Sequence, residues 1–300
     1  DRLAEMARAL PPYAWGLRAA RFDVSALANG MLRATEMSAV FPDGELYSAP
    51  HGDELPPPVA LTALDGVTEA VFYLAIHPLK AIGGNYRDAQ AAGGFDTRYT
   101  HSNTPAPDLY TGATTAELAF LRKDVRLISE FEPRDDLLAI PVARVRRTAS
   151  AGYELDGTFI PPSLSLTASG ALHEQLRRLL DALQAKVNAL YGFHREPSKN
   201  IIEFRSGDVA SFWLLHTANE AYATLSHLFH HPQLHPERLF QELARLAGAL
   251  MTFSKVHTLA DLPMYRHDAP GPAFARMDEI LRDLLETVIS TRYFSIVLEE

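Results

Sequence analysis

The chain has 300 residues, of which 47% are hydrophobic and 22% charged. This is the composition of a soluble globular protein, and the length allows one large domain and favours two. Its formal net charge of −9 argues against nucleic-acid binding, because phosphate contacts require a basic surface. It contains no cysteine, which excludes disulfides, thiolate metal sites and a thiol nucleophile, and no apolar run is long enough to insert into a membrane.

The first half of the chain has the pattern of a β domain. Residues 1–165 contain 12 of the 17 glycines and 14 of the 20 prolines, and these residues punctuate short strands. Alternating residues over 31–41, the turn Pro42-Asp43-Gly44 and a return over 45–49 predict a hairpin. Further strands are predicted over 70–76, 124–132, 137–146 and 152–160, and a long mobile loop over 83–115. Several short strands of this kind predict a β-sandwich or barrel.

After Pro161-Pro162 the apolar spacing becomes helical. A first helix is predicted from a cap at Ser169 to a stop at Gly192, and a second from a cap at Ser206. A third begins with Pro236 and a fourth after Gly271-Pro272, so that four helices joined by short loops predict an antiparallel bundle. Residues 293–298 read as a strand that opens another domain.

Histidine provides the strongest enzyme-like pattern in the chain. His227 and His231 are four residues apart, a spacing that lets two imidazoles bind one metal on a helix, but Leu228 stands where a zincin has its general base. Ser169-Gly170 lacks the first glycine of a nucleophile elbow. We therefore predict no catalytic residue, no metal site and no cofactor, and keep a histidine-ligated hydrolase only as an alternative.

Two apolar features have both a core and an interface interpretation. The leucines of the first predicted helix can be buried within one bundle, or they can bind another copy of the chain. The aromatic residues Tyr13, Trp15 and Phe22 can anchor the first strand, or they can form a binding surface for a partner. The candidate residues for a self-association interface are Leu172, Leu176, Leu179, Leu180, Leu183 and Leu190.

A series of short motifs resembles the TssK family, the baseplate subunits of type VI secretion systems. Tyr13-Ala14-Trp15-Gly16-Leu17 resembles the Tyr-Gly-Trp-Gly element near the start of that family, and Phe41-Pro42-Asp43-Gly44 resembles its hairpin turn. Further matches, in the family's order, are Leu55-Pro56-Pro57-Pro58, Ile140-Pro141-Val142-Ala143-Arg144-Val145, Phe159-Ile160-Pro161-Pro162, Leu234-His235-Pro236-Glu237-Arg238-Leu239-Phe240, Leu250-Met251-Thr252-Phe253 and Tyr265-Arg266-His267-Asp268. The family's Trp-rich opening segment is missing before Asp1, and family members continue well past Glu300.

The resemblance implies an α+β protein with a shoulder (1–165, a β-sandwich related to phage receptor-binding proteins), a four-helix neck (166–292) and the start of a head (293–300). It implies a non-catalytic homotrimer on the cytoplasmic side of an inner-membrane-docked baseplate. The shoulder would bind the wedge proteins TssF and TssG, and the missing head would bind the TssJ–TssL–TssM membrane complex. We assign the wedge surface to Tyr13, Trp15, Gly16, Phe41, Asp43 and Gly44. A phage-type glycan-binding tail protein is a second alternative, because it shares the shoulder architecture.

Overall fold

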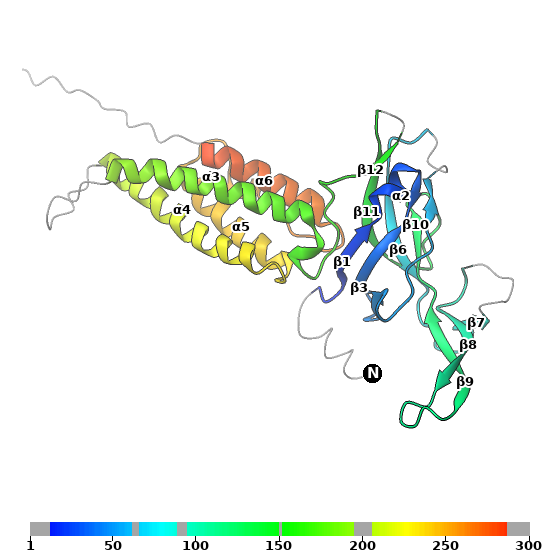
Figure 1. Ribbon diagram of the computed structural model, residues 1–300. Helices are drawn as coiled ribbons and strands as arrows, with labels where there is room; N and C mark the ends of the chain where they lie inside the picture. Colours follow the sequence, from blue (N-terminus) through cyan, green and yellow to red (C-terminus); the bar gives the residue numbers. More distant parts are fainter. Residues whose placement is uncertain (1–12, 62–65, 89–94, 150–151, 195–205, 287–300) are drawn as a thin grey trace, which may run out of the picture. The chain divides into compact units, whose positions relative to one another are not determined.

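A computed structural model describes residues 13–61, 66–88, 95–149, 152–194 and 206–286. The chain is a mixture of sheets and helices and divides into two compact units, residues 1–169 and 170–300, which are described separately (Figure 1). The predicted strand over 293–298 lies outside the described residues.

The first unit begins with a three-stranded antiparallel sheet in the order β1-β3-β4, made of β1 (Gly16–Phe22), β3 (Ala34–Val40) and β4 (Leu46–Ala49). The predicted hairpin is confirmed, because β3 and β4 pair from Val40↔Leu46 to Met37↔Ala49. The short helix α2 (Val24–Ala28) follows β1 and is capped by the Asp23 carboxylate, which accepts from the amides of Ser25 and Ala26. A small ladder joins β2 (Met31–Leu32) to β5 (Val59–Ala60).

A four-stranded sheet in the order β10-β6-β11-β12 faces the same core. It contains β6 (Glu69–Ile76), β10 (Arg126–Ser129), β11 (Leu138–Arg147) and β12 (Tyr153–Leu155), so each strand predicted between 70 and 160 is present. Large side chains from both sheets are completely buried together, which is the dominant stabilising contribution in a domain of this kind. The core is centred on Leu17, Leu32, Met37, Phe41, Tyr47, Phe72, Leu74 and Ile140.

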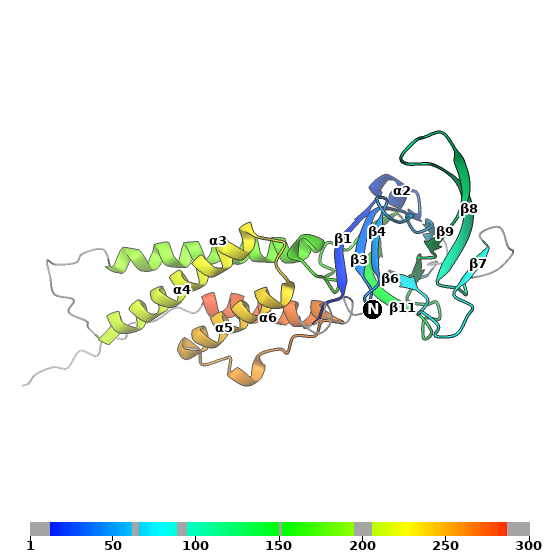
Figure 2. The same ribbon diagram turned by 90° about the horizontal axis from the view of Figure 1, so that it is seen from below.

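The predicted loop over 83–115 is wrong. This part of the chain forms β7 (Tyr86–Asp88) and β8 (Tyr99–Pro107), which with β9 (Thr115–Lys123) make a third sheet in the order β7-β8-β9. Strand β8 contains Asn103, Pro105 and Pro107, residue types that are depleted in strands. Its nine residue pairs with β9 stabilise it nevertheless, and a propensity scale cannot show such a partner. The β8–β9 hairpin extends away from the other two sheets (Figure 2).

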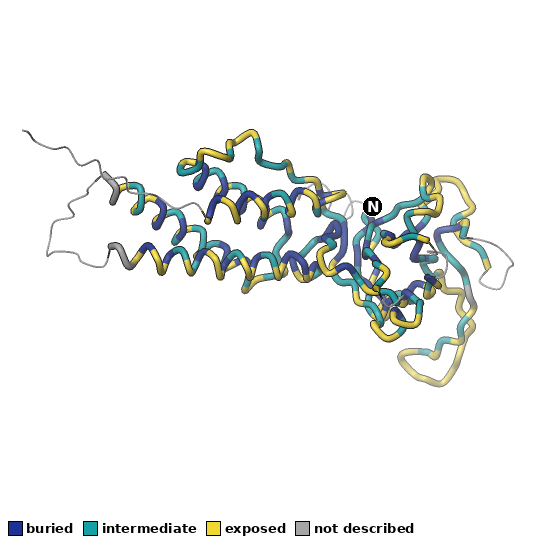
Figure 3. The backbone as a smooth tube through the Cα atoms, turned by 90° about the horizontal axis from the view of Figure 1, so that it is seen from above, coloured by how far each residue is buried: buried dark blue, intermediate teal, exposed yellow. Residues whose placement is uncertain are grey.

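Within the described residues, the second unit contains four long helices. They are α3 (Gly170–His194), α4 (Ser206–His230), α5 (Pro236–Leu250) and α6 (Pro270–Glu286). Each helix packs against the next, and α3 also packs against α6; buried residues recur along each of the four helices (Figure 3). The predicted stop at Gly192 is two residues early, because α3 continues to His194. The 3₁₀ turns η2 (Leu166–Ala168), η3 (Met251–Phe253) and η4 (Leu259–Asp261) lie in the connections.

Candidate functional site

The turn between β3 and β4 is held by its own backbone. The Gly44 amide donates to the Phe41 carbonyl at 2.8 Å, and the Phe41 amide donates to the Glu45 carbonyl at 2.9 Å. Gly44 has a φ of +89°, a conformation that glycine adopts without a steric penalty. The Asp43 carboxylate accepts from the Glu45 amide at 3.1 Å. The Pro-Asp-Gly sequence therefore specifies this turn locally.

A buried arginine joins this turn to the segment before β8. Arg98 is only 2% exposed, and its guanidinium forms ion pairs with Asp43 at 2.8 Å and with Glu45 at 2.9 Å. Its Nη1 also donates to the His77 carbonyl at 2.8 Å. Burial alone would lower the pKa of Arg98, but the hydrogen bonds to Glu45 and Asp43 outweigh that effect and the pKa lies above its ordinary value.

Lys123, at the end of β9, extends the same polar network. Its ammonium lies 3.2 Å from a Glu45 carboxylate oxygen and 3.1 Å from Asp53. Two cations, Arg98 just before β8 and Lys123 at the end of β9, thus meet acidic groups in and just after the β3–β4 hairpin. We call Asp43, Glu45, Asp53, Arg98 and Lys123 the clasp, because these side chains fix the third sheet to the first.

The predicted wedge-binding residues are not one continuous surface. Phe41 is completely buried beside Tyr47, with ring centroids 6.5 Å apart, and Trp15 packs against the core of the first unit. Gly16 is also buried, and a Cβ there would lie 2.8 Å from the Pro162 carbonyl oxygen. The rings of Phe41 and Trp15 help to build the fold, and Gly16 has no room for a side chain. Sequence alone does not separate core aromatic residues from exposed ones.

Trp15 is only partly buried, and the remaining three predicted residues also retain some surface. Tyr13 is 38% exposed with a φ of +61°, and Asp43 and Gly44 are partly exposed at the turn. Asp43 is nevertheless engaged by Arg98 in the clasp. The residues that the sequence assigned to the wedge surface therefore have little side-chain surface available for binding a partner.

A more extensive apolar surface lies on β9, which sequence reasoning missed. Residues 115–121 are all exposed, and among them Leu118, Phe120 and Leu121 have exposed fractions of 47%, 43% and 57%. Leu109 and Tyr110, in the connection between β8 and β9, are almost fully exposed. The run Leu118-Ala119-Phe120-Leu121, just after the predicted loop, was the available signal. Apolar patches of this kind mark interaction surfaces.

Five of the six candidate interface leucines belong to the interior of the helical unit. Leu179 alone is partly exposed; the others are at most 9% exposed within a single copy of the chain. A leucine that its own chain has covered has no side-chain surface left for a second copy. Of the six candidates, Leu179 is therefore the one that a second copy of the chain can contact. The other five are buried within their own helical unit: Leu172, Leu176, Leu180, Leu183 and Leu190.

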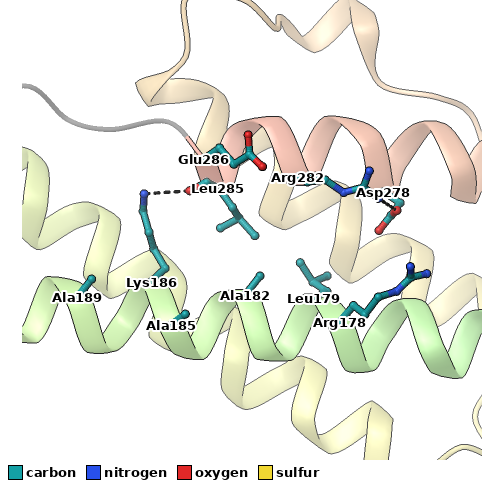
Figure 4. Close-up of a pocket in the computed structure, with 10 residues that line it drawn as sticks. All are labelled: Arg178, Leu179, Ala182, Ala185, Lys186, Ala189, Asp278, Arg282, Leu285 and Glu286. Atoms are coloured by element: carbon teal, nitrogen blue, oxygen red, sulfur yellow. Dashed lines mark hydrogen bonds and ion pairs between the residues drawn. The ribbon is translucent and has the colours of Figure 1, made fainter.

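Leu179 borders a groove between α3 and α6 (Figure 4). The groove encloses about 580 Å³, and Ala182, Ala185 and Ala189 line its α3 side. The Lys186 ammonium donates to the Leu285 carbonyl at 2.9 Å at one end of the groove, and burial lowers its pKa. The remaining lining residues are Arg178, Asp278, Arg282, Leu285 and Glu286. We call this feature the α3–α6 groove.

The two histidines of the hydrolase alternative are adjacent on α4 and just beyond its end. The rings of His227 and His231 stack with centroids 4.2 Å apart, and the Nδ1 of His231 lies 2.9 Å from the carbonyl oxygen of His227. Within the described residues no third histidine or carboxylate joins them as a metal-binding group. Within the same residues, every helix is too short or too polar to cross a lipid bilayer.

Comparison with known proteins agrees with the motifs. The family described as "Bacterial Type VI secretion, VC_A0110, EvfL, ImpJ, VasE" matches residues 1–300. The type VI secretion system baseplate component TssK1 of Pseudomonas aeruginosa is 30% identical over 301 residues. That match includes 98% of this chain and 65% of TssK1, so the chain spans less than two-thirds of the relative's length.

Solved structures show the same fold. A chain of a TssK-TssF-TssG baseplate subcomplex is 35% identical with a TM-score of 0.83, and the match covers 95% of this chain and 91% of that one. TssK from the EAEC type VI system, solved with a nanobody, is 33% identical with a TM-score of 0.82, covering 98% and 97%. A chain of a type VI baseplate complex is 36% identical with a TM-score of 0.85, covering 97% and 65%. Motifs, family match and fold agree: this chain belongs to the bacterial type VI secretion family that includes the structural baseplate component TssK.

Proposed function

We propose that this chain is the shoulder and neck of a TssK-type baseplate subunit, a non-catalytic trimeric adaptor. The observation that carries the proposal is the similarity along almost the whole chain, in sequence and in fold, to TssK and to a chain of a TssK-TssF-TssG subcomplex. On this proposal the shoulder side binds TssF and TssG. A further head domain then links the subunit to the TssJ–TssL–TssM complex at the inner membrane.

The proposed architecture assigns residues 1–165 to a β-sandwich shoulder and 166–292 to a four-helix neck. The buried faces of the β1-β3-β4 and β10-β6-β11-β12 sheets share one core, which is the arrangement that a sandwich requires. The cyclic contacts of α3, α4, α5 and α6 support a bundle. Residues 293–300 are proposed to open the head.

We place the wedge-binding surface on the exposed side chains of β9, in addition to Tyr13 and the Pro42–Gly44 turn. Interface hot spots are aromatic or large apolar side chains that are accessible before binding, and Phe120 and Leu118 meet this condition whereas Phe41 does not. The clasp anchors the base of the β8–β9 hairpin at Arg98 and Lys123. A rigidly anchored hairpin binds with a smaller loss of conformational entropy than a loop does.

The test is capture of TssF–TssG from the same secretion system by the 300-residue chain. We expect wild-type chain to retain the pair and the variant Leu118→Asp/Phe120→Asp to lose most of it. Val24→Asp is the matched control, because Val24 is 74% exposed on α2 in the same unit. Capture by all three proteins would contradict the β9 assignment alone, whereas no capture by the wild-type chain would contradict the proposed partners.

A further inference from the structure

The backbone of β9 is paired on one side only. Strand β9 stands at the end of the order β7-β8-β9, and its hairpin with β8 extends away from the other two sheets (Figure 2). An antiparallel strand at the edge of a sheet directs the N–H and C=O groups of every second residue away from its partner. The hydrogen bonds at the two ends of the hairpin decide which residues of β9 these are.

The even-numbered residues of β8 and β9 bond to each other, and the odd-numbered residues face outward. Where the hairpin turns, the Asp108 amide donates to the Thr114 carbonyl at 2.9 Å, so this even-numbered pair is a hydrogen-bonded one. At the other end, the Tyr99 amide donates at 2.9 Å to the Asn85 carbonyl on the side of β7, away from β9. The register runs without a shift between these ends. The residues of β9 with outward backbone groups are therefore Thr115, Glu117, Ala119 and Leu121. In the part of the chain that the structure describes, no other segment pairs with them.

The opposite edge of the same hairpin is blocked by proline. Strand β7 pairs only with Tyr99, Thr100 and His101 of β8. Farther along β8, Pro105 and Pro107 occupy outward-facing positions, and proline has no N–H to donate. Natural sheets use proline in this way to protect an edge that must stay unpaired. The sequence of β9 contains no proline, so its outward edge keeps every amide and can pair with another strand.

The apolar side chains of β9 also lack a partner strand. Leu118 and Phe120 share one face of the sheet and are 47% and 43% exposed. The register places Thr104 opposite Leu118 and Ser102 opposite Phe120, so β8 has no apolar residue across from either. Because apolar cross-strand pairs stabilise a sheet, a strand with apolar residues on this face would provide the missing contacts.

The charge of this edge indicates what kind of strand it binds. Over residues 115–121 the one charged side chain is that of Glu117, which is exposed and forms no ion pair with another described residue. Its backbone groups face outward, so a strand that pairs with β9 passes beside its carboxylate. Opposite charges across a strand pair attract each other, and this chain carries a net charge of −9. A basic residue beside Glu117 is therefore complementary.

We propose that β9 binds its partner by strand addition: an extended segment of the TssF–TssG pair bonds to the outward backbone groups of Thr115–Leu121 and continues the β7-β8-β9 sheet. The segment has apolar side chains at alternate positions, which contact Leu118 and Phe120, and a basic side chain beside Glu117. In this mode main-chain hydrogen bonds provide affinity and the alternate side chains provide specificity. The inference rests on the proposed function and adds the way in which the partner is held.

Proline substitution tests the backbone contact without removing an apolar side chain. Ala119→Pro deletes one outward N–H of β9 and leaves Leu118 and Phe120 in place. We expect it to weaken capture of TssF–TssG by the 300-residue chain about tenfold, because a partner carbonyl loses its donor. Asn103→Pro is the matched control: Asn103 is paired with Ala119 in the register, and its outward N–H lies on the β8 edge. This variant should capture like wild type, and circular dichroism checks that both variants fold.

Amide hydrogen exchange of the wild-type chain provides a readout that needs no variant. Binding of TssF–TssG should slow exchange about tenfold at Glu117, Ala119 and Leu121, whose amides face outward. The amides of Leu118 and Phe120 already bond to β8 and should change much less.

Three outcomes would overturn strand addition while leaving the proposed partners intact. They are equal slowing at odd and even residues of β9, wild-type capture by a folded Ala119→Pro chain, and equal loss of capture in both folded proline variants. A wild-type chain that captures neither TssF nor TssG would instead contradict the proposed function, and strand addition with it.

Discussion

Arg98 and Asp43 form a 2.8 Å ion pair that joins the segment before β8 to the turn after β3. The pair connects two sheets that share no strand, and the arginine is 2% exposed. Because Glu45 uses the second guanidinium nitrogen, the arginine is held by two carboxylates at once. The position of the β8–β9 hairpin thus depends on a side chain outside both of its strands.

We expect Arg98→Ala to lower the free energy of unfolding of the first unit by about 2–3 kcal/mol, because it removes charge-assisted hydrogen bonds and leaves two carboxylates beside each other. Arg98→Lys should recover little of this loss, since one ammonium cannot reproduce the forked geometry. Urea unfolding followed by tryptophan fluorescence gives the values. Arg122→Ala is the control: its exposed pair with Glu54 should contribute less than about 1 kcal/mol. Equal effects of the two alanine variants would contradict a special role for Arg98.

Gly16 is expected to be structural. Its φ is +124°, and a Cβ would approach the Pro162 carbonyl oxygen to 2.8 Å, so Gly16→Ala should destabilise the first unit by about 1–3 kcal/mol. Gly157→Ala is a matched control, because a Cβ at that position meets no atom within 4 Å. Thermal unfolding of both variants tests this expectation. If Gly16→Ala keeps wild-type stability but loses capture of TssF–TssG, the residue acts in partner binding and the structural interpretation is wrong.

Asp156 should make the first unit sensitive to acid. Burial alone would raise its pKa, but hydrogen bonds from Thr158 and the charges of Arg146 and Arg144 hold the pKa below its usual value. A lowered pKa adds stability that is complete above the unfolded value of about 3.9 and is lost as the pH falls through the folded value. We therefore expect Asp156→Asn to cost about 2 kcal/mol at pH 7 and to flatten the pH dependence below about pH 4. Denaturant titrations between pH 3 and 7 measure this, and an unchanged acid slope in the variant would be inconsistent with it.

The β3–β4 hairpin, the strands of the β10-β6-β11-β12 sheet and the four long helices could be predicted because their signals are local. The turn at Pro42–Gly44 and the proline that begins α5 each fix the backbone within a few residues. The third sheet could not be found in this way. Its strand β8 is a poor strand former by composition, and it is specified by pairing with β9 and by the contact of Arg98 with Asp43.

The candidate site was less predictable than the fold for a related reason. The sequence does not distinguish an apolar residue that is buried within its own chain from one that a partner protein buries. Phe41 and Phe120 illustrate this: the first is completely buried under the β3–β4 turn, and the second is 43% exposed on β9. Only the packing of distant strands distinguishes them. The same limit applied to the leucines of α3, where helical spacing identifies an apolar row but not which part of it stays accessible.

Leu179 and Leu183 provide the sharpest remaining test, because they are four residues apart on α3 and differ in burial. Leu183 is 0% exposed, so Leu183→Ala should lower the stability of the helical unit by about 2–4 kcal/mol through the cavity it leaves. Leu179 lines the α3–α6 groove and is partly exposed, so Leu179→Ala should cost less than about 1 kcal/mol while weakening self-association. Val256→Ala, at an 80% exposed position of the same unit, should change neither quantity. Sedimentation and urea unfolding of the three variants separate the effects, and a Leu179→Ala chain that associates like wild type would exclude the groove from the contact between copies.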